Sequence, residues 1–160
     1  MPRIQRFPIH LRFGDEDSYG HVNNVRFLQY LEDARVQFMH LPLSEAAHGD
    51  AKASDTLLET IGPDHFTLVA RHEIEYSAPL NYRPSPLEIS IWVTGVGGSS
   101  FDLGYQIAEP DGSTSYALAA STMIQVNRTT GRPTKLNGAQ RYALEHWRAD
   151  PVAFRRRQNG

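Results

Sequence analysis

The residues of this chain best suited to catalysis gather in one short stretch, residues 15–24, which read DEDSYGHVNN. Among its acids, Asp17 could serve as a general base or as a nucleophile. His21 and the side chain of Asn24 could place a water molecule or a carbonyl group beside that carboxylate. Together these residue types suit the attack of water or of a carboxylate on a carbonyl carbon.

An element must position these groups, and the residues that follow them predict an amphipathic helix. Either Asn23 or Asn24 can cap its first turn, and Gly20 lets the chain fold back tightly before it. Pro42 should end the helix. The apolar stripe recurs at helical spacing, at Phe27, Leu31, Ala34 and Phe38.

The start of this predicted helix offers a place for negative charge. Its unpaired amides carry about half a positive elementary charge. The amide near Asn24 could therefore hold an oxygen that becomes negative during a reaction. The same residues also fit a simpler interpretation, in which the acids are solvated, His21 is a loop residue and the asparagines only cap. Spacing alone leaves both interpretations open.

Length and composition exclude several classes of protein. With 160 residues, of which 40% are hydrophobic, the chain fits one globular domain over residues 1–160. A formal net charge of −2 lacks the basic excess of proteins that bind nucleic acids or anionic membranes, so we expect neither partner. No segment resembles a signal peptide or a membrane span, which favours a cytoplasmic protein.

Other recognised types of site are not predicted. The chain has no cysteine, so it has no disulfide, thiolate metal site or cysteine nucleophile. Its 7 histidines show none of the spacings typical of metal sites. There is no nucleophile elbow, P-loop or dinucleotide-binding glycine motif. We therefore expect neither a bound metal nor a separate cofactor.

The remaining chain predicts mostly strands. A first strand within residues 3–13 contains Pro8, which marks an edge strand or a bulge. Residues 43–64 read as a loop with one helical turn. In residues 65–79, alternation places positions 66, 68, 70, 72, 74 and 76 on one side of a long strand.

Turn residues predict how the later strands connect. Residues 97–100 and 110–113 should close two hairpins. We expect the four later strands to follow in meander order, at 65–79, 87–95, 101–108 and 116–127. A short helix near residues 139–147 and a polar tail should follow. The pattern predicts an α+β fold in which one antiparallel sheet wraps the helix.

The order of the motif residues resembles a known family. The pattern D-x-D-x-x-G-H-V-N-N at residues 15–24 is followed by F/Y-x-x-Y-x-E-x-A-R. Together they resemble the opening of hotdog-fold acyl-CoA thioesterases of the 4-hydroxybenzoyl-CoA thioesterase-like family. The second pattern is carried by Phe27, Tyr30, Glu32, Ala34 and Arg35, and later similarities lie at residues 74–80, 97–107 and 127–133.

This resemblance implies a fold and an activity. The expected fold is the hotdog fold, an antiparallel sheet of about five strands around one long central helix, with its core over residues 6–133. The expected activity is hydrolysis of an acyl-CoA thioester to free acid and coenzyme A, which enters as part of the substrate. Asp17 matches the catalytic carboxylate, and the amide near Asn24 matches the oxyanion donor. His21 is a further candidate that could position water.

The resemblance also implies substrate contacts elsewhere in the chain. The turn at residues 97–100 could cradle phosphate, although it also fits a plain hairpin turn. Arg83 and Arg128 could pair with phosphates of coenzyme A, and Asn23 is a candidate contact at the helix start. The predicted residues of the turn are Gly97, Gly98, Ser99 and Ser100.

Two other functions stay open on the same fold. One is a non-catalytic module that binds acyl-CoA or acyl-carrier protein, and the other is a hydratase or dehydratase with an Asp–His pair. Residues 83–86 and the long loop at 43–64 depart from the family pattern beside the expected substrate pocket. The resemblance implies a homodimer or homotetramer with active sites near the interface between subunits.

Overall fold

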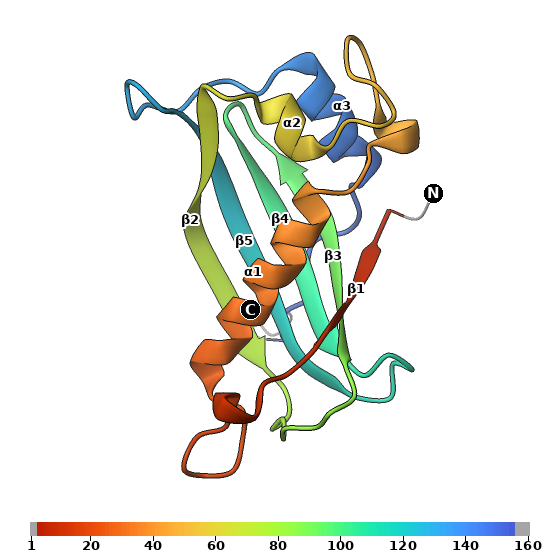
Figure 1. Cartoon of the computed structure of the whole chain (residues 1–160), viewed down its shortest axis with the longest axis vertical. Helices are drawn as coiled ribbons and strands as arrows, with labels where there is room; N and C mark the ends of the chain where they lie inside the picture. Colours follow the sequence, from red (N-terminus) through yellow and green to blue (C-terminus); the bar gives the residue numbers. More distant parts are fainter. Residues whose placement is uncertain (1–2, 156–160) are drawn as a thin grey trace.

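One long helix, α1, lies across one face of a five-stranded antiparallel sheet, and shorter helices cover one end of that sheet (Figure 1). This computed structural model describes residues 3–155. The last part of the predicted polar tail, residues 156–160, lies outside the described residues.

The elements follow the predicted order closely. The helices are α1 (Asn24–Met39), α2 (Leu57–Ile61) and α3 (Gly138–His146), with 3-10 turns η1 (Phe13–Asp15) and η2 (Ser44–Ala46). The strands are β1 (Gln5–Ile9), β2 (His65–Tyr76), β3 (Leu87–Val96), β4 (Ser100–Ala108) and β5 (Ser115–Asn127).

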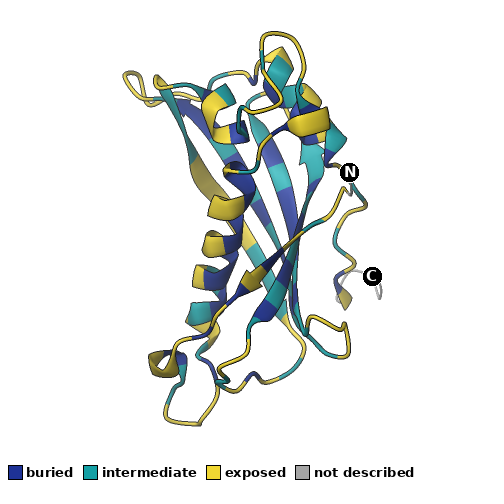
Figure 2. Ribbon diagram, turned by 45° about the vertical axis from the view of Figure 1, so that its right-hand side comes forward, coloured by how far each residue is buried: buried dark blue, intermediate teal, exposed yellow. Residues whose placement is uncertain are grey.

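Helix α1 begins and packs as its sequence predicts. Asn23 is the N-cap, and its Oδ1 accepts a hydrogen bond of 2.9 Å from the Val25 amide. The helix ends at Met39, before Pro42. The whole predicted apolar stripe is buried, and Figure 2 shows the buried face of the helix turned toward the sheet. At about 1.5 Å per residue, the helix spans much of the sheet's length.

The order of the strands is β1-β3-β4-β5-β2. Two hairpins join β3, β4 and β5 as predicted, but the full meander order is wrong, because β2 pairs with β5 instead of β3. The connection at residues 77–86 is too long for a tight hairpin and contains three prolines. Strand β1, which contains Pro8, lies at the other edge of the sheet, where a missing amide donor is tolerated.

A β-bulge at Ala70 interrupts β2. Its extra residue shifts the alternation by one, so side chains on either side of it point to opposite faces. His72 lies opposite Ser121 on the buried face of β5, whereas Leu68 faces away from the core and is 50% exposed. The prediction that positions 66, 68, 70, 72, 74 and 76 share one face of the strand is therefore wrong. Positions 66 and 68, before the bulge, lie on the opposite face from positions 72, 74 and 76.

The predicted loop at residues 43–64 contains more structure than one helical turn. Besides η2, it forms α2 with a capping box: the Thr56 hydroxyl accepts from the Glu59 amide, and the Glu59 carboxylate accepts from the Thr56 amide at 2.7 Å. The T-x-x-E pattern is a sequence signal for this helix start. Helix α2 packs beside α3 at one end of the sheet (Figure 1).

The chain after α3 returns along the outer face of the sheet. Val93 and Ala149 pair through a 2.9 Å backbone hydrogen bond, and Asp150 O accepts a hydrogen bond from the Trp92 indole. Gly104 allows this close approach. A Cβ atom at residue 104 would lie 2.8 Å from side-chain carbons of both Trp92 and Val152.

We expect Gly104→Ala to lower the free energy of unfolding by about 1–3 kcal/mol, because the added methyl group overpacks this contact. Urea unfolding of the purified variant measures the loss. Gly98→Ala is the matched control, since a Cβ atom there meets nothing within 4 Å. Equal urea midpoints for the two variants would contradict this prediction, because they would show that residues 149–154, here called the outer segment, move aside without loss of stability.

Candidate active site

A small closed loop precedes α1. The Asp17 amide donates to His21 O at 2.8 Å, and the Gly20 amide donates to Asp17 O at 3.1 Å. Gly20 has φ 78°, a left-handed conformation that glycine adopts without strain. The Val22 amide donates to Leu80 O at 2.7 Å, so the loop is tied to the chain that follows β2.

The buried side chain of Asp15 connects the segment before this loop to α1. Its Oδ2 accepts hydrogen bonds from the Tyr30 hydroxyl at 2.6 Å and the Arg12 amide at 3.1 Å. The Arg26 guanidinium lies 3.6 Å from Oδ1. Burial raises the pKa of Tyr30 above its ordinary value, and the hydrogen bond to Asp15 raises it further. Sequence reasoning gave Asp15 no such role.

Asp17, two residues later, has a different environment. Its side chain is half-buried, and Oδ1 accepts a hydrogen bond of 2.9 Å from the Tyr19 amide. Within the described residues its other carboxylate oxygen accepts no hydrogen bond. The loop therefore holds the backbone of Asp17 while leaving part of its carboxylate available to a ligand.

The first amide of α1 is also available. The amides of Val25 and Arg26 donate to the side chain and carbonyl of Asn23. Among residues 3–155, by contrast, no acceptor pairs with the Asn24 amide. The Asn24 carbonyl accepts a hydrogen bond of 2.9 Å from the Tyr76 hydroxyl at the end of β2. The predicted oxyanion donor is thus an unpaired N–H at the positive end of a helix.

A cavity of about 360 Å³ opens at this end of the helix. His21 and Asn24 line it, whereas Asp17 is not among its lining residues and is joined to it through the backbone hydrogen bond to His21. The walls are otherwise mainly apolar, from Val22, Phe27, Tyr76, Ala78, Pro79 and Leu80.

The predicted phosphate-binding turn lies at the other end of the sheet, beside α3 (Figure 1). Gly97 N donates to Ser100 O at 2.7 Å, which closes the hairpin. Arg141 donates to the carbonyl oxygens of Gly97 and Gly98, and the Gln125 amide donates to Ser99 O. A single chain therefore does not bring this turn to the start of α1.

The two predicted arginines have partners within the chain. Arg83 donates to both carboxylate oxygens of Glu109 and to a backbone carbonyl oxygen. These hydrogen bonds, with one from Tyr116, lower the pKa of Glu109. Arg128 donates to Pro63 O at 2.9 Å and lies 5.2 Å from the ring centre of Phe66. A contact of either arginine with phosphate stays a prediction.

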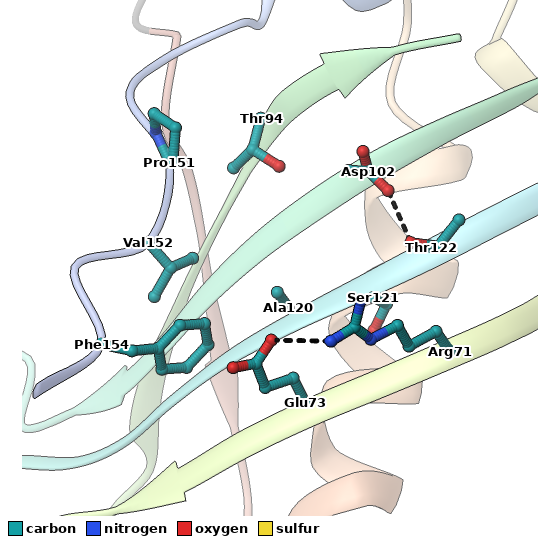
Figure 3. Close-up of a pocket in the computed structure, with 10 residues that line it drawn as sticks. All are labelled: Arg71, Glu73, Thr94, Asp102, Ala120, Ser121, Thr122, Pro151, Val152 and Phe154. Carbon is teal, nitrogen blue, oxygen red and sulfur yellow. Dashed lines mark hydrogen bonds and ion pairs between the residues drawn. The ribbon is translucent and has the colours of Figure 1, made fainter. Parts of the chain in front are cut away.

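A second cavity, of about 290 Å³, lies on the face of the sheet away from α1, under the outer segment (Figure 3). Arg71 and Glu73 form an ion pair there at 3.6 Å, and Thr122 donates to Asp102 at 2.6 Å. None of the candidate residues lines this cavity, whereas two of them, His21 and Asn24, line the cavity at the helix start.

The described residues form neither a metal site nor a helix able to span a membrane. Residues 3–155 contain no group of three or more His, Asp or Glu side chains that could hold a metal ion. Within the same part of the chain, no helix combines the length and apolar character needed to cross a membrane.

Comparison with known proteins places this geometry in context. Residues 11–144 match the model of the thioesterase-like superfamily. The protein YsmA of Bacillus subtilis is 24% identical over 140 residues, which cover 88% of this chain and 84% of YsmA.

Solved structures agree with this match. A thioesterase from Thermus thermophilus, complexed with coenzyme A and Zn, is 26% identical, covers 94% of this chain and 97% of its own, and superposes with a TM-score of 0.66. The PA5185 protein from Pseudomonas aeruginosa is 24% identical, with 91% and 92% of the chains covered and a TM-score of 0.70. These structures have the same fold as this chain.

We expect Asp15→Asn to lower the free energy of unfolding by about 1–3 kcal/mol. An amide at residue 15 must turn its NH₂ group either toward Arg26 or toward the donors at Tyr30 and Arg12. Asp17→Asn should change stability by less than about 0.5 kcal/mol, because an asparagine preserves the hydrogen bond to the Tyr19 amide. Chemical unfolding of both variants checks this difference, and similar losses would contradict it.

Proposed function

Because the chain belongs to the thioesterase-like superfamily, we propose that it hydrolyses an acyl-CoA thioester to a free acid and coenzyme A. The observation that carries this proposal is the unpaired amide of Asn24, on a residue that lines an apolar cavity beside the loop of Asp17. The likeness to a thioesterase solved with coenzyme A supports a CoA thioester as the substrate.

The hotdog fold expected from the sequence is confirmed. A five-stranded antiparallel sheet packs against one long helix, as in the thioesterase structures that this chain resembles. This fold matters for chemistry because the sheet buries one face of α1 and leaves its first turn beside an open cavity.

Electrostatic stabilisation is the first part of the proposed mechanism. The thioester carbonyl oxygen accepts a hydrogen bond from the Asn24 amide and gains negative charge as the tetrahedral intermediate forms. The dipole of α1 adds to this attraction. The apolar walls of the cavity reduce screening by water and so strengthen both effects.

The carboxylate of Asp17 supplies the second part. As a general base it takes a proton from water while the water oxygen attacks the carbonyl carbon, and the proton then passes to the departing thiolate of coenzyme A. As a nucleophile it would instead attack the carbonyl carbon and expel the thiolate of coenzyme A, and water would then hydrolyse the resulting mixed anhydride to the free acid and the restored Asp17 carboxylate. His21 lines the cavity and is the candidate that orients the attacking water.

A homodimer joined along β2 would complete this site. Edge strand β1 is short and contains Pro8, whereas edge strand β2 has 12 residues and no proline. Two apolar side chains on β2 itself, Leu68 and Val69, are exposed. An exposed strand of this kind favours pairing with another strand.

Antiparallel pairing of β2 with its copy sets opposite ends of the two subunits side by side. His65, at the start of β2, would then approach Tyr76 of the second subunit, beside the catalytic cavity. Arg128 lies near that start, since its amide donates to Asp64 O at 2.9 Å. Arg128 and the turn at residues 97–100 could thus serve the site of the other subunit, although one chain holds them apart.

Asp17→Ala should lower kcat/KM for acyl-CoA hydrolysis by about 10²–10⁴-fold, the usual contribution of a positioned base. Release of free thiol from a panel of acyl-CoA substrates measures the effect. Asp33→Ala is the control, because Asp33 is an exposed acid in the middle of α1 that does not line the cavity at the helix start. Single-turnover hydrolysis in ¹⁸O-water separates the two roles, since direct attack leaves unlabelled oxygen from Asp17 in the first product.

Retained activity in Asp17→Ala would remove this residue from the mechanism. Binding of acyl-CoA by the wild type without release of thiol would instead favour the non-catalytic module, and addition of water to enoyl-CoA would favour a hydratase.

Val69→Glu should convert the dimer into monomers, because each dimer would bury charged groups on paired edge strands. Sedimentation velocity measures the change, and activity should fall with it. Tyr142→Glu on α3 is the matched control, since Tyr142 is 44% exposed and Val69 is 38% exposed. A wild type that hydrolyses acyl-CoA as a monomer would contradict a shared site.

A further inference from the structure

Glu16 lies between Asp15 and Asp17 and connects this acidic stretch to the chain that follows β2. Its backbone is extended, with φ −72° and ψ 143°, and its side chain is half-buried. The carboxylate oxygen Oε1 accepts a hydrogen bond of 2.8 Å from the amide of Tyr82, 66 residues further along the chain. The D-x-D pattern allows any residue at position 16, so this contact is a property of this particular chain.

Residues 15–17 and residues 21–23 lie side by side as two short arms. Glu16 and Val22 lie opposite each other in an antiparallel bridge between the arms, and backbone hydrogen bonds of 2.8 and 2.9 Å flank this bridge. The first arm carries the carboxylate of Asp17, and the second arm leads directly into α1. The position of that carboxylate relative to α1 therefore depends on how the two arms are held.

Each arm has its own attachment to residues 80–82. The Val22 amide, on the second arm, donates to Leu80 O at 2.7 Å. The Glu16 carboxylate, on the first arm, accepts from the Tyr82 amide. The side chain of Glu16 thus gives the arm of Asp17 a contact that does not pass through the second arm.

Residues 80–82 are themselves held firmly. Leu80 is only 2% exposed, and Tyr82 packs against the hydrophobic core. The ring of Tyr82 also meets that of Phe13 edge to face, with ring centres 5.7 Å apart and planes at 90°. Residues 77–80 line the cavity at the helix start. One segment therefore supplies both a wall of the cavity and the attachment of the first arm.

This attachment bears on the rate of the proposed reaction. A hydrogen bond to an ionised carboxylate is stronger than one between neutral groups. A displacement of about 1 Å at a reacting group can cost about 10²-fold in rate. Without the Glu16 carboxylate, the first arm would keep its bonds to the second arm but lose its own contact with the cavity wall.

We propose that Glu16 is a positioning residue, which holds the arm of Asp17 in place beside the cavity through the Tyr82 amide. This inference rests on the proposed function and adds a residue to its mechanism. Glu16 takes no part in the chemical step itself, and its effect on hydrolysis passes through Asp17.

Two substitutions separate the hydrogen bond from the charge of Glu16. Glu16→Ala removes the acceptor, whereas Glu16→Gln keeps a carbonyl oxygen that can accept from the Tyr82 amide. Glu59→Ala is the matched control, because the Glu59 carboxylate also accepts from a backbone amide, that of Thr56, at 2.7 Å. Glu59 belongs to α2, at the end of the sheet away from the start of α1 (Figure 1).

The first experiment measures thiol release from the acyl-CoA that the wild type hydrolyses fastest. Glu16→Ala should lower kcat by about tenfold and change KM by less than about threefold, because the residues that line the cavity are unchanged. Glu16→Gln and Glu59→Ala should retain kcat within about twofold. A wild-type kcat in Glu16→Ala, or an equal loss in Glu16→Gln, would overturn the inference.

A double variant tests whether the effect passes through Asp17. Glu16→Ala combined with Asp17→Ala should have the same kcat/KM as Asp17→Ala alone, within about twofold, because residues that act as one unit are not additive. A further loss of about tenfold in the double variant would show that Glu16 acts by another route, and would overturn the inference.

Hydrogen exchange measured by mass spectrometry tests the attachment without any substrate. In Glu16→Ala, amides within residues 15–23 should exchange at least about tenfold faster than in the wild type, whereas in Glu59→Ala their exchange should be unchanged. A wild type that releases no thiol from any acyl-CoA, together with this exchange pattern, would reject hydrolysis but uphold the attachment. Thiol release by the wild type, with unchanged exchange in Glu16→Ala, would reject the attachment alone.

Discussion

The buried carboxylate of Asp15 is the interaction on which the rest of the site depends. A carboxylate removed from water must be paired and hydrogen-bonded, or it destabilises the fold. Asp15 meets this need with the Tyr30 hydroxyl, the Arg12 amide and the Arg26 guanidinium. Arg12 precedes the closed loop of residues 17–21, and Arg26 and Tyr30 follow it. Their contacts with the Asp15 carboxylate therefore fix the position of this loop relative to α1. The loop itself is short, and one glycine with a left-handed backbone closes it.

Asp15 and Asp17 are only two residues apart in the motif, but their carboxylates have different surroundings. The carboxylate of Asp15 accepts hydrogen bonds from other residues of the protein. In Asp17, by contrast, only one of the two carboxylate oxygens accepts a hydrogen bond from a described residue. The helix start shows the same division, because Asn23 caps the next amides and leaves that of Asn24 unpaired. A donor and a carboxylate that are preorganised in this way need little rearrangement when charge develops, which is the main advantage of an enzyme site over water.

The sheet imposes a second constraint. Helix α1 spans the sheet, so groups at its start are far from the turn at residues 97–100 and from Arg128, which lie toward the other end. The free edge at β2 offers a physical route by which a second subunit brings such groups together. The bulge at Ala70 lies in this same edge strand. It places His72 on the face toward the core and Leu68 on the exposed face. The proposed catalytic groups and the proposed contact between subunits thus lie at one helix start and along one strand.

The sequence by itself determined the features that depend on neighbouring residues. The apolar stripe of α1, the hairpin turns and the edge position of Pro8 follow from local periodicity and backbone geometry. Only the tertiary structure decided which residues meet across long separations: the pairing of β2 with β5, the bulge, the Tyr30–Asp15 hydrogen bond and the capture of Arg83 by Glu109. Local patterns are repeated within a few residues and so can be read along the chain. A partner 15 or 26 residues away, as in the last two contacts, is selected only when packing brings the two side chains together and excludes water from them.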